Sequence, residues 1–228
     1  FKDEKNLNPT DKTQDDKNSS TTSPGVVPNG PISPAFAKQR YRDYLSTYEL
    51  TEIGGFPSIY FVGRPTNSSS SINTRGGSQN FGFDILPTCH YKAQVGDHIA
   101  YRYEILSIFG RGSFGEVVKC FDHKTKTQVA IKILVNTPLM HRQGSIEVQN
   151  MLHVNQTNSS FITKVTDSFT FRNHICIVTE VLSNSLLKYL ETNNFTPMPA
   201  KLLKSVVYDI TAGLADIHKS KIIHADLK

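Results

Sequence analysis

The feature that most constrains the fold is the glycine pattern GRGSFG at residues 110–115, together with the residues that follow it. The spacing G-x-G-x-x-G alone is weak evidence, because dinucleotide-binding folds share it. Such folds place a helix directly after the glycines. Here apolar and β-branched residues continue to Phe121, and a polar stretch from Asp122 to Thr125 then predicts a turn. The glycine loop should therefore join two antiparallel strands, the first of which spans residues 101–109.

A glycine-rich hairpin can bind phosphate, because backbone without Cβ atoms can approach the phosphate oxygens and present N–H groups to them. Phe114 at the tip would help to shield the phosphates from water. The next predicted strand, Val129 to Leu134, carries Lys132 between apolar neighbours. A buried ammonium group needs a partner. An edge-strand lysine that points at solvent is the alternative, but its place seventeen residues after Gly115 favours a phosphate-binding lysine.

The partner of Lys132 should be a carboxylate on the following helix. Glu147 is the only acidic residue between Lys132 and Asp167, so it is the predicted partner. The same segment supplies Ile146, Met151 and Val154 as the expected packing residues of that helix.

Two apolar strands, 161–171 and 174–181, are predicted next, joined by a polar turn at Arg172 and Asn173. The second strand should lead into a linker between two lobes, where backbone groups of Glu180 and Leu182 can hydrogen-bond adenine and Thr179 forms the rear wall of the pocket. The full set of expected nucleotide contacts is Phe109, Gly110, Arg111, Gly112, Ser113, Phe114, Gly115, Val117, Ala130, Lys132, Thr179, Glu180 and Leu182.

Apolar residues then recur at three- and four-residue intervals from Leu202 to Ile217, which predicts a long amphipathic helix. The helix leads to His224-Ala225-Asp226-Leu227-Lys228. In phosphoryl transfer an Asp at this place accepts or orients the proton of the substrate hydroxyl, and Lys228 would steady the transferring phosphate. The expected catalytic residues are therefore Asp226, Lys228, Lys132 and Glu147.

Composition divides the chain into four parts. Residues 1–35 are rich in Asn, Asp, Ser, Thr and Pro and are expected to be disordered. Residues 36–100 form an accessory region, with a short amphipathic helix around Tyr41 to Leu50, an extended segment at 59–62 and a flexible insert at 66–80. Residues 101–182 form the nucleotide-binding lobe, and residues 183–228 begin a second, helical lobe.

The net charge of +5 is dispersed over the chain, so nucleic acid is not an expected partner. No apolar run approaches the length of a membrane span, so no membrane partner is expected either. The three cysteines, Cys89, Cys120 and Cys176, lack a paired spacing and favour a reducing interior. We expect a monomer.

With its glycine loop, Val129-Ala130-Ile131-Lys132, Glu147 and His224-x-Asp226-Leu227-Lys228 in this order, the chain resembles eukaryotic protein kinases. More narrowly, it resembles the dual-specificity tyrosine-phosphorylation-regulated kinases, the DYRK family. Three segments carry that resemblance: 97–104, 169–176 and the upstream box that ends at 56–63, which is similar to the homology box of the family's second class. The resemblance covers residues 36–228, apart from the Ser-rich insert.

This resemblance implies an α+β kinase fold, with an antiparallel-sheet ATP lobe followed by the start of a helical C-terminal lobe that is truncated at the catalytic loop. It also implies ATP and Mg²⁺ as cofactors, with the metal ligands beyond residue 228 and none within this chain. The implied partners are ATP and protein substrates, which would be phosphorylated on Ser or Thr, alongside autophosphorylation on Tyr. The implied location is the cytoplasm, the nucleus or both.

Three residues depart from the family pattern. Phe109 stands where an aliphatic residue usually covers the adenine, and Thr179 replaces a bulky Phe, which should enlarge the rear pocket. Ala225 replaces the Arg found in most kinases, so the catalytic loop cannot use that Arg to hold a phosphorylated activation loop. A catalytically silent nucleotide-binding protein is the main alternative, and a purely regulatory interaction module is a third. Without the magnesium ligands and activation loop, the 228 residues alone should not transfer phosphate, and their long helix should expose its apolar face.

Overall fold

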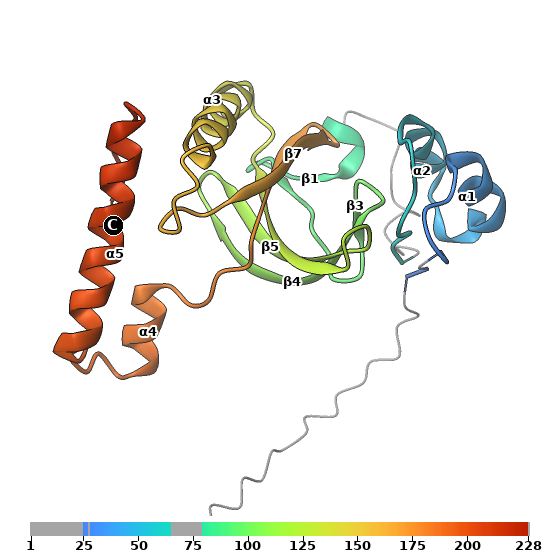
Figure 1. Cartoon of the computed structure of the whole chain (residues 1–228). Coiled ribbons are helices and arrows are strands. Elements are labelled where there is room, and N and C mark those ends of the chain that lie inside the picture. The colour runs from blue at the N-terminus through green and yellow to red at the C-terminus, as the bar shows by residue number, and fades with distance from the viewer. Residues whose placement is uncertain (1–24, 27, 65–78, 228) are drawn as a thin grey trace, which may run out of the picture.

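A six-stranded antiparallel sheet forms the centre of the structure, a computed structural model that describes residues 25–26, 28–64 and 79–227 (Figure 1). Its strand order is β3-β4-β5-β6-β8-β7. The strands are β3 (His98–Ile99), β4 (Tyr103–Gly112), β5 (Gly115–Asp122), β6 (Thr127–Leu134), β7 (Val165–Phe171) and β8 (His174–Thr179). The predicted α+β fold and its antiparallel sheet are confirmed.

Strands β4 and β5 form the predicted hairpin. Gly112 pairs with Gly115 across its tip, which leaves Ser113 and Phe114 as the turn. The strand predicted for 161–171 is shorter than expected, because β7 begins at Val165, and the following strand β8 ends at Thr179 rather than at residue 181.

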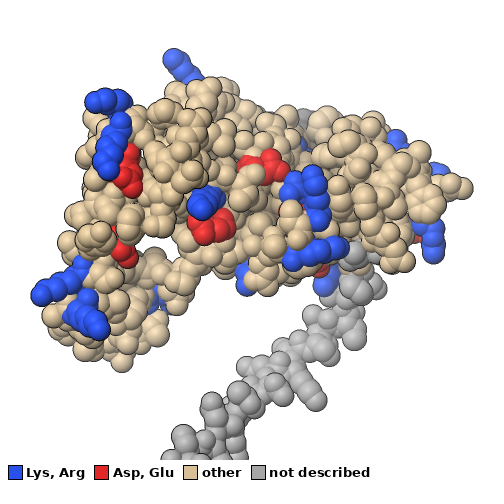
Figure 2. Space-filling view, in the orientation of Figure 1, with Lys and Arg blue, Asp and Glu red and all other residues tan. Residues whose placement is uncertain are grey.

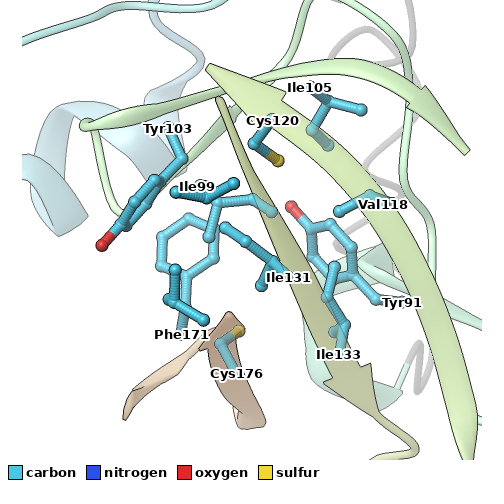
Figure 3. Close-up of a cluster of buried hydrophobic side chains, with 12 residues drawn as sticks. Tyr91, Ile99, Tyr103, Ile105, Val118, Cys120, Ile131, Ile133, Phe171 and Cys176 are labelled. Atoms are coloured by element: carbon cyan, nitrogen blue, oxygen red, sulfur yellow. The ribbon is translucent and has the colours of Figure 1, made fainter. Parts of the chain in front are cut away.

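The main hydrophobic core covers one face of the sheet, and Figure 3 shows side chains from several strands converging there. Its members include Ile131 and Ile133 of β6, and Tyr91 of β2 (His90–Tyr91). Strand β2 pairs with β1 (Asp84–Ile85) in a separate two-stranded sheet. Because successive side chains of a strand point to opposite faces, Lys132 lies on the face away from this core.

The accessory region begins with several short helices instead of the single helix predicted around Tyr41 to Leu50. They are α1 (Pro34–Arg40), η1 (Arg42–Tyr44), α2 (Thr47–Glu52) and η2 (Ile53–Gly55). The break occurs because Ser46 starts a new helix: its hydroxyl accepts a hydrogen bond from the Glu49 N–H, and the Glu49 side chain accepts one from the Ser46 N–H. Apolar residues of these helices form a second core, which also contains Tyr101.

Some residues before position 36, which the sequence predicts to be disordered, form regular contacts. Val26 pairs with Val62 and Ile32 with Ile59, so the described residues before position 36 add an extended segment to the accessory region. The apolar side chains of Val26 and Ile32 lie against the segment at 59–62. The polar composition of residues 1–35 taken together gives no sign of this packing. The rest of the predicted disordered segment, residues 1–24 and 27, lies outside the described residues, as do residues 66–78 of the predicted insert. Its last residues, Gln79 and Asn80, begin η4 (Gln79–Gly82).

Three further helices complete the fold: the long helices α3 (Pro138–Asn155) and α5 (Ala200–Lys219), and the short helix α4 (Leu186–Thr192). Helix α3 lies beside the sheet, whereas α5 stands apart from it (Figure 1). The amphipathic helix is thus confirmed, as is its exposed apolar face: Leu203, Val207 and Ile210 are all between 45% and 50% exposed. Among the described helices, none has the length and apolar character needed to cross a membrane.

Candidate nucleotide-binding and phosphotransfer site

Lys132 and Glu147 form an ion pair between β6 and α3. Their Nζ and Oε1 atoms are 2.5 Å apart, and both side chains remain about one-third exposed on a cleft. Two local features place α3 for this contact. The Thr137 hydroxyl caps the helix by accepting a hydrogen bond from the Met140 N–H at 3.2 Å. Gly144 has no side chain, so the helix can approach Leu134 and Ile175 closely.

The helix face around Glu147 differs in part from the prediction. Val154 is buried, as expected for a packing residue, but Ile146 is 51% exposed. Both residues line the cleft, together with Met151. Gly144, rather than a large apolar residue, is buried opposite Leu134. A search of the sequence for large apolar residues does not find this contact.

The glycines of the β4–β5 hairpin fall into two kinds. A Cβ atom on Gly115 would collide with the backbone carbonyl of Ile133, so the fold itself requires glycine there. At Gly110 and Gly112 no protein atom lies within 4 Å of the place that a Cβ would occupy, and neither backbone is in the left-handed region. The fold does not require glycine at these two positions. Their absent side chains leave room for a ligand to approach the backbone, which fits a phosphate group.

The aromatic residues of the hairpin are exposed: Phe109 is 51% and Phe114 is 56% exposed. Arg111 forms an ion pair with Glu116 at 3.1 Å, and the Glu116 side chain is fully buried. Arg111 is thus engaged with its own hairpin rather than directed at a ligand. On the cleft face, Val117 of β5 pairs in register with Lys132 of β6.

The predicted linker begins where β8 ends. Ala130 of β6 pairs in register with Thr179, so both lie at the same level of the sheet. The Thr179 hydroxyl donates a hydrogen bond to the Glu180 carbonyl at 3.2 Å, and the Glu180 carboxylate accepts one from the Lys164 N–H at 3.2 Å. Leu182 is 58% exposed on the segment that runs to α4.

The segment after α5 brings Asp226 to the same cleft. Lys132, Glu147, His224, Ala225 and Asp226 all line one open cavity of about 1440 Å³ between the sheet, α3 and α5. The Asp226 N–H donates a hydrogen bond to His224 Nδ1 at 3.3 Å, which orders the backbone beside the carboxylate. Lys228, the remaining predicted catalytic residue, lies outside the described residues.

Comparison with known families matches residues 103–228 to the protein kinase domain. The chain belongs to the protein kinase family.

Curated relatives of this chain carry the name of a narrower family. It is 38% identical over 214 residues to the human dual specificity tyrosine-phosphorylation-regulated kinase 3, a match that covers 92% of this chain and 35% of the relative. It is 35% identical over 187 residues to the DYRK-family kinase pom1 of Schizosaccharomyces pombe, which covers 81% of this chain and 17% of that protein. The predicted resemblance to the DYRK family is confirmed. The chain spans about a third or less of the length of these relatives.

A buried charge cluster surrounds Arg172, which the sequence pattern assigns only to a polar turn. The Arg172 side chain is only 1% exposed, and its guanidinium group donates to Glu49 Oε1 at 2.8 Å and to Glu52 Oε2 at 3.0 Å. It also donates to the Tyr91 hydroxyl at 3.1 Å. Glu52 and Glu49 lie 120 and 123 positions before Arg172 in the sequence, so no local pattern reveals these ion pairs.

Three ligand-bearing residues of this cluster, Glu49, Asp97 and His98, are close enough together to hold a metal ion. The guanidinium group of Arg172 already lies 2.8 Å from Glu49 and 3.3 Å from His98 Nε2, so it supplies the positive charge that a metal would bring. The cluster therefore serves as a structural ion pair. It joins α2 of the accessory region to the turn between β7 and β8.

Figure 2 shows Lys and Arg side chains spread singly or in small groups over the visible face of the molecule, several of them beside Asp or Glu. No large basic area interrupts the mixed surface in this view.

Proposed function

We propose that the protein containing this chain binds ATP in the cleft and transfers its γ-phosphate to Ser or Thr side chains of protein substrates, with autophosphorylation on Tyr. The observation that carries the proposal is the Lys132–Glu147 ion pair, which lines the same cleft as Asp226. Three groups that phosphoryl transfer requires thus converge from β6, α3 and the segment after α5.

Each residue has a distinct part in the proposed reaction. Lys132 Nζ would donate hydrogen bonds to the phosphates of ATP, and Glu147 would hold that ammonium group in place. N–H groups of the β4–β5 hairpin would contact the phosphates where Gly110 and Gly112 leave open space. Asp226 would accept the proton of the substrate hydroxyl, and Lys228 would steady the transferring phosphate. ATP supplies the phosphoryl group, and Mg²⁺ would neutralise its developing charge.

The base of the nucleotide would lie toward the end of β8. Backbone groups of Glu180 and Leu182 are the proposed adenine partners, with Ala130 and Thr179 on the adjoining wall. The register of Ala130 with Thr179 supports this arrangement, because it puts both small side chains at the point where the chain leaves the sheet.

The proposal is tested by phosphotransfer from ATP to a Ser/Thr peptide library with the full-length protein. Lys132→Met and Asp226→Asn should each lower kcat/KM by about 100-fold or more, since each removes a group used in the transition state. Lys124→Met is the matched control, because Lys124 is an exposed residue of the β5–β6 turn, away from the cleft. Its activity should equal that of the unchanged protein.

Nucleotide binding separates this proposal from a catalytically silent protein. A fluorescent ATP analogue that binds with no peptide or Tyr phosphorylation under any metal condition would contradict the proposed transfer. Phosphorylation that survives Lys132→Met and Asp226→Asn would contradict the proposed roles of these residues. The dual specificity is tested by mass spectrometry of the purified protein, which should show phosphotyrosine on itself and only phosphoserine or phosphothreonine on substrates.

A further inference from the structure

Strand β2 makes a direct contact with the tip of the glycine hairpin. The Nε2 atom of His90 lies 2.8 Å from the carbonyl oxygen of Gly112. Because a carbonyl oxygen only accepts hydrogen bonds, the His90 ring carries its proton on Nε2 and donates it. His90 is 8% exposed, so the imidazole side of this hydrogen bond is shielded from solvent, while Gly112 itself is exposed.

This contact comes from the face of the sheet opposite the cleft. Tyr91, the neighbour of His90, packs in the core with Ile131 and Ile133. Lys132 lies between those two residues and points to the other face, where the cleft is. His90 therefore holds the hairpin from its outer side.

Holding the Gly112 carbonyl also sets the direction of the next N–H group. In a planar trans peptide the C=O and N–H bonds point in opposite directions. A Gly112 carbonyl held toward His90 turns the N–H of Ser113 away from β2 and toward the cleft face. This is the direction in which it can donate to a phosphate oxygen.

The same short segment also holds the start of α3. The Cys89 carbonyl accepts a hydrogen bond from the Asn136 N–H at 2.9 Å, and Asp84 Oδ2 accepts one from Asn136 Nδ2 at 2.9 Å. Asn136 directly precedes Thr137, which caps the helix that carries Glu147. Residues 84–91 thus contact both elements that would grip the phosphates.

We infer that His90 is a positioning residue for nucleotide binding, which orients the Gly112–Ser113 peptide so that the Ser113 N–H faces the phosphates. This inference rests on the proposed function. Without the imidazole donor, the peptide is free to rotate, and the hairpin must be ordered when the nucleotide binds.

The test compares His90→Leu, which removes the donor, with His90→Gln, whose side-chain amide can donate from a similar position. In the full-length protein His90→Leu should raise the KM for ATP about tenfold, which corresponds to about 1.4 kcal/mol. This is the size of one hydrogen bond in a protein. The KM for the peptide substrate should not change, and His90→Gln should restore the KM for ATP to within about threefold of the unchanged protein.

His123→Leu is the matched control. His123 is also buried, at 6% exposed, and its Nε2 atom contacts Glu104 at 2.8 Å. It follows Asp122, at the end of β5 remote from the hairpin. Its loss should lower the melting temperature without raising the KM for ATP. Equal effects of His90→Leu and His123→Leu on that KM would show a merely structural role and overturn the inference, as would a His90→Gln variant as impaired as His90→Leu.

The dissociation constant of a fluorescent ATP analogue keeps this test separate from that of phosphotransfer. If the unchanged protein transfers no phosphate but the analogue binds about tenfold more weakly to His90→Leu and normally to His90→Gln, the positioning role stands and the proposed transfer fails. If the analogue binds all three proteins equally, the positioning role fails. Absence of binding to the unchanged protein would overturn both.

Discussion

Arg172→Met should lower the free energy of unfolding by about 3–5 kcal/mol, the usual cost of removing one partner of a buried ion pair. The magnitude follows from what the substitution leaves behind. The side chains of Glu49 and Glu52 are 9% and 11% exposed, and both would lose the guanidinium group that they contact. Met keeps much of the apolar contact with the ring of Phe83, which lies 3.9 Å from the centre of the guanidinium group. The expected loss is therefore electrostatic more than it is a loss of packing.

A matched set of variants separates these two effects. Adding Glu49→Gln and Glu52→Gln to Arg172→Met removes the uncompensated carboxylates while it retains their shape. This triple variant should be more stable than Arg172→Met alone, although it still lacks the charged hydrogen bonds of the unchanged chain.

The same substitution should change the response to acid. Burial alone would raise the pKa of Glu49, but electrostatic interactions with His98 and Arg172 and hydrogen bonds from Ser46 hold the pKa below its ordinary value of 4.5. A carboxyl group with a lowered pKa stabilises the folded state above its unfolded pKa, and this contribution is lost as the pH falls through its folded pKa. In Arg172→Met the interaction with Arg172 is gone, so Glu49 stabilises the folded state less at pH 7, and the stability difference between the variant and the unchanged chain should narrow as the pH falls.

Urea unfolding followed by circular dichroism at pH 7 and at pH 5 measures both effects. The chain contains no Trp, so its tyrosines supply the fluorescence signal for a second probe. A loss below about 1 kcal/mol at pH 7, the level of an exposed ion pair, would refute the reasoning. So would a triple variant that is less stable than Arg172→Met.

Three further outcomes are expected. Gly115→Ala should lower the free energy of unfolding by about 1–3 kcal/mol in urea unfolding, because the added Cβ meets a backbone carbonyl. Gly144→Ala should change it by no more than about 1 kcal/mol, because the Leu134 methyl that the Cβ meets can move and alanine favours the helix. Thr137→Ala should cost about 0.5–2 kcal/mol in the same assay, because it removes the cap of α3. Thr179→Phe should weaken the binding of inhibitors that carry a bulky rear group about tenfold or more while it leaves the KM for ATP within about threefold, as measured by inhibition and steady-state kinetics.

The parts of the fold that local sequence determines could be predicted. The β4–β5 hairpin followed from the strand residues after Gly115, and the Lys132–Glu147 pair followed from the absence of any competing carboxylate before Asp167. The break in the first helix could also have been found, because Ser46 and Glu49 have the spacing of a capping box.

The rest could not be predicted, because it depends on contacts between distant segments. Arg172 is an ordinary turn residue by sequence, and it becomes buried only when the accessory region folds over it. His90 is one of eight histidines, and only the sheet topology brings it to Gly112. Contacts of this kind depend on register and layer packing, which residue type and spacing do not encode.

These long-range contacts make the accessory region and the sheet one packing unit rather than two neighbouring parts divided near residue 100. Tyr91 belongs to the main core, and Tyr101 belongs to the second core beside the helices. Asp84 of β1 accepts hydrogen bonds from Asn80, Asn136 and His174, so η4, the residue before the cap of α3 and the start of β8 share one carboxylate. Since α3 carries Glu147 and β2 contacts the glycine hairpin, the accessory region is packed directly against elements that line the cleft.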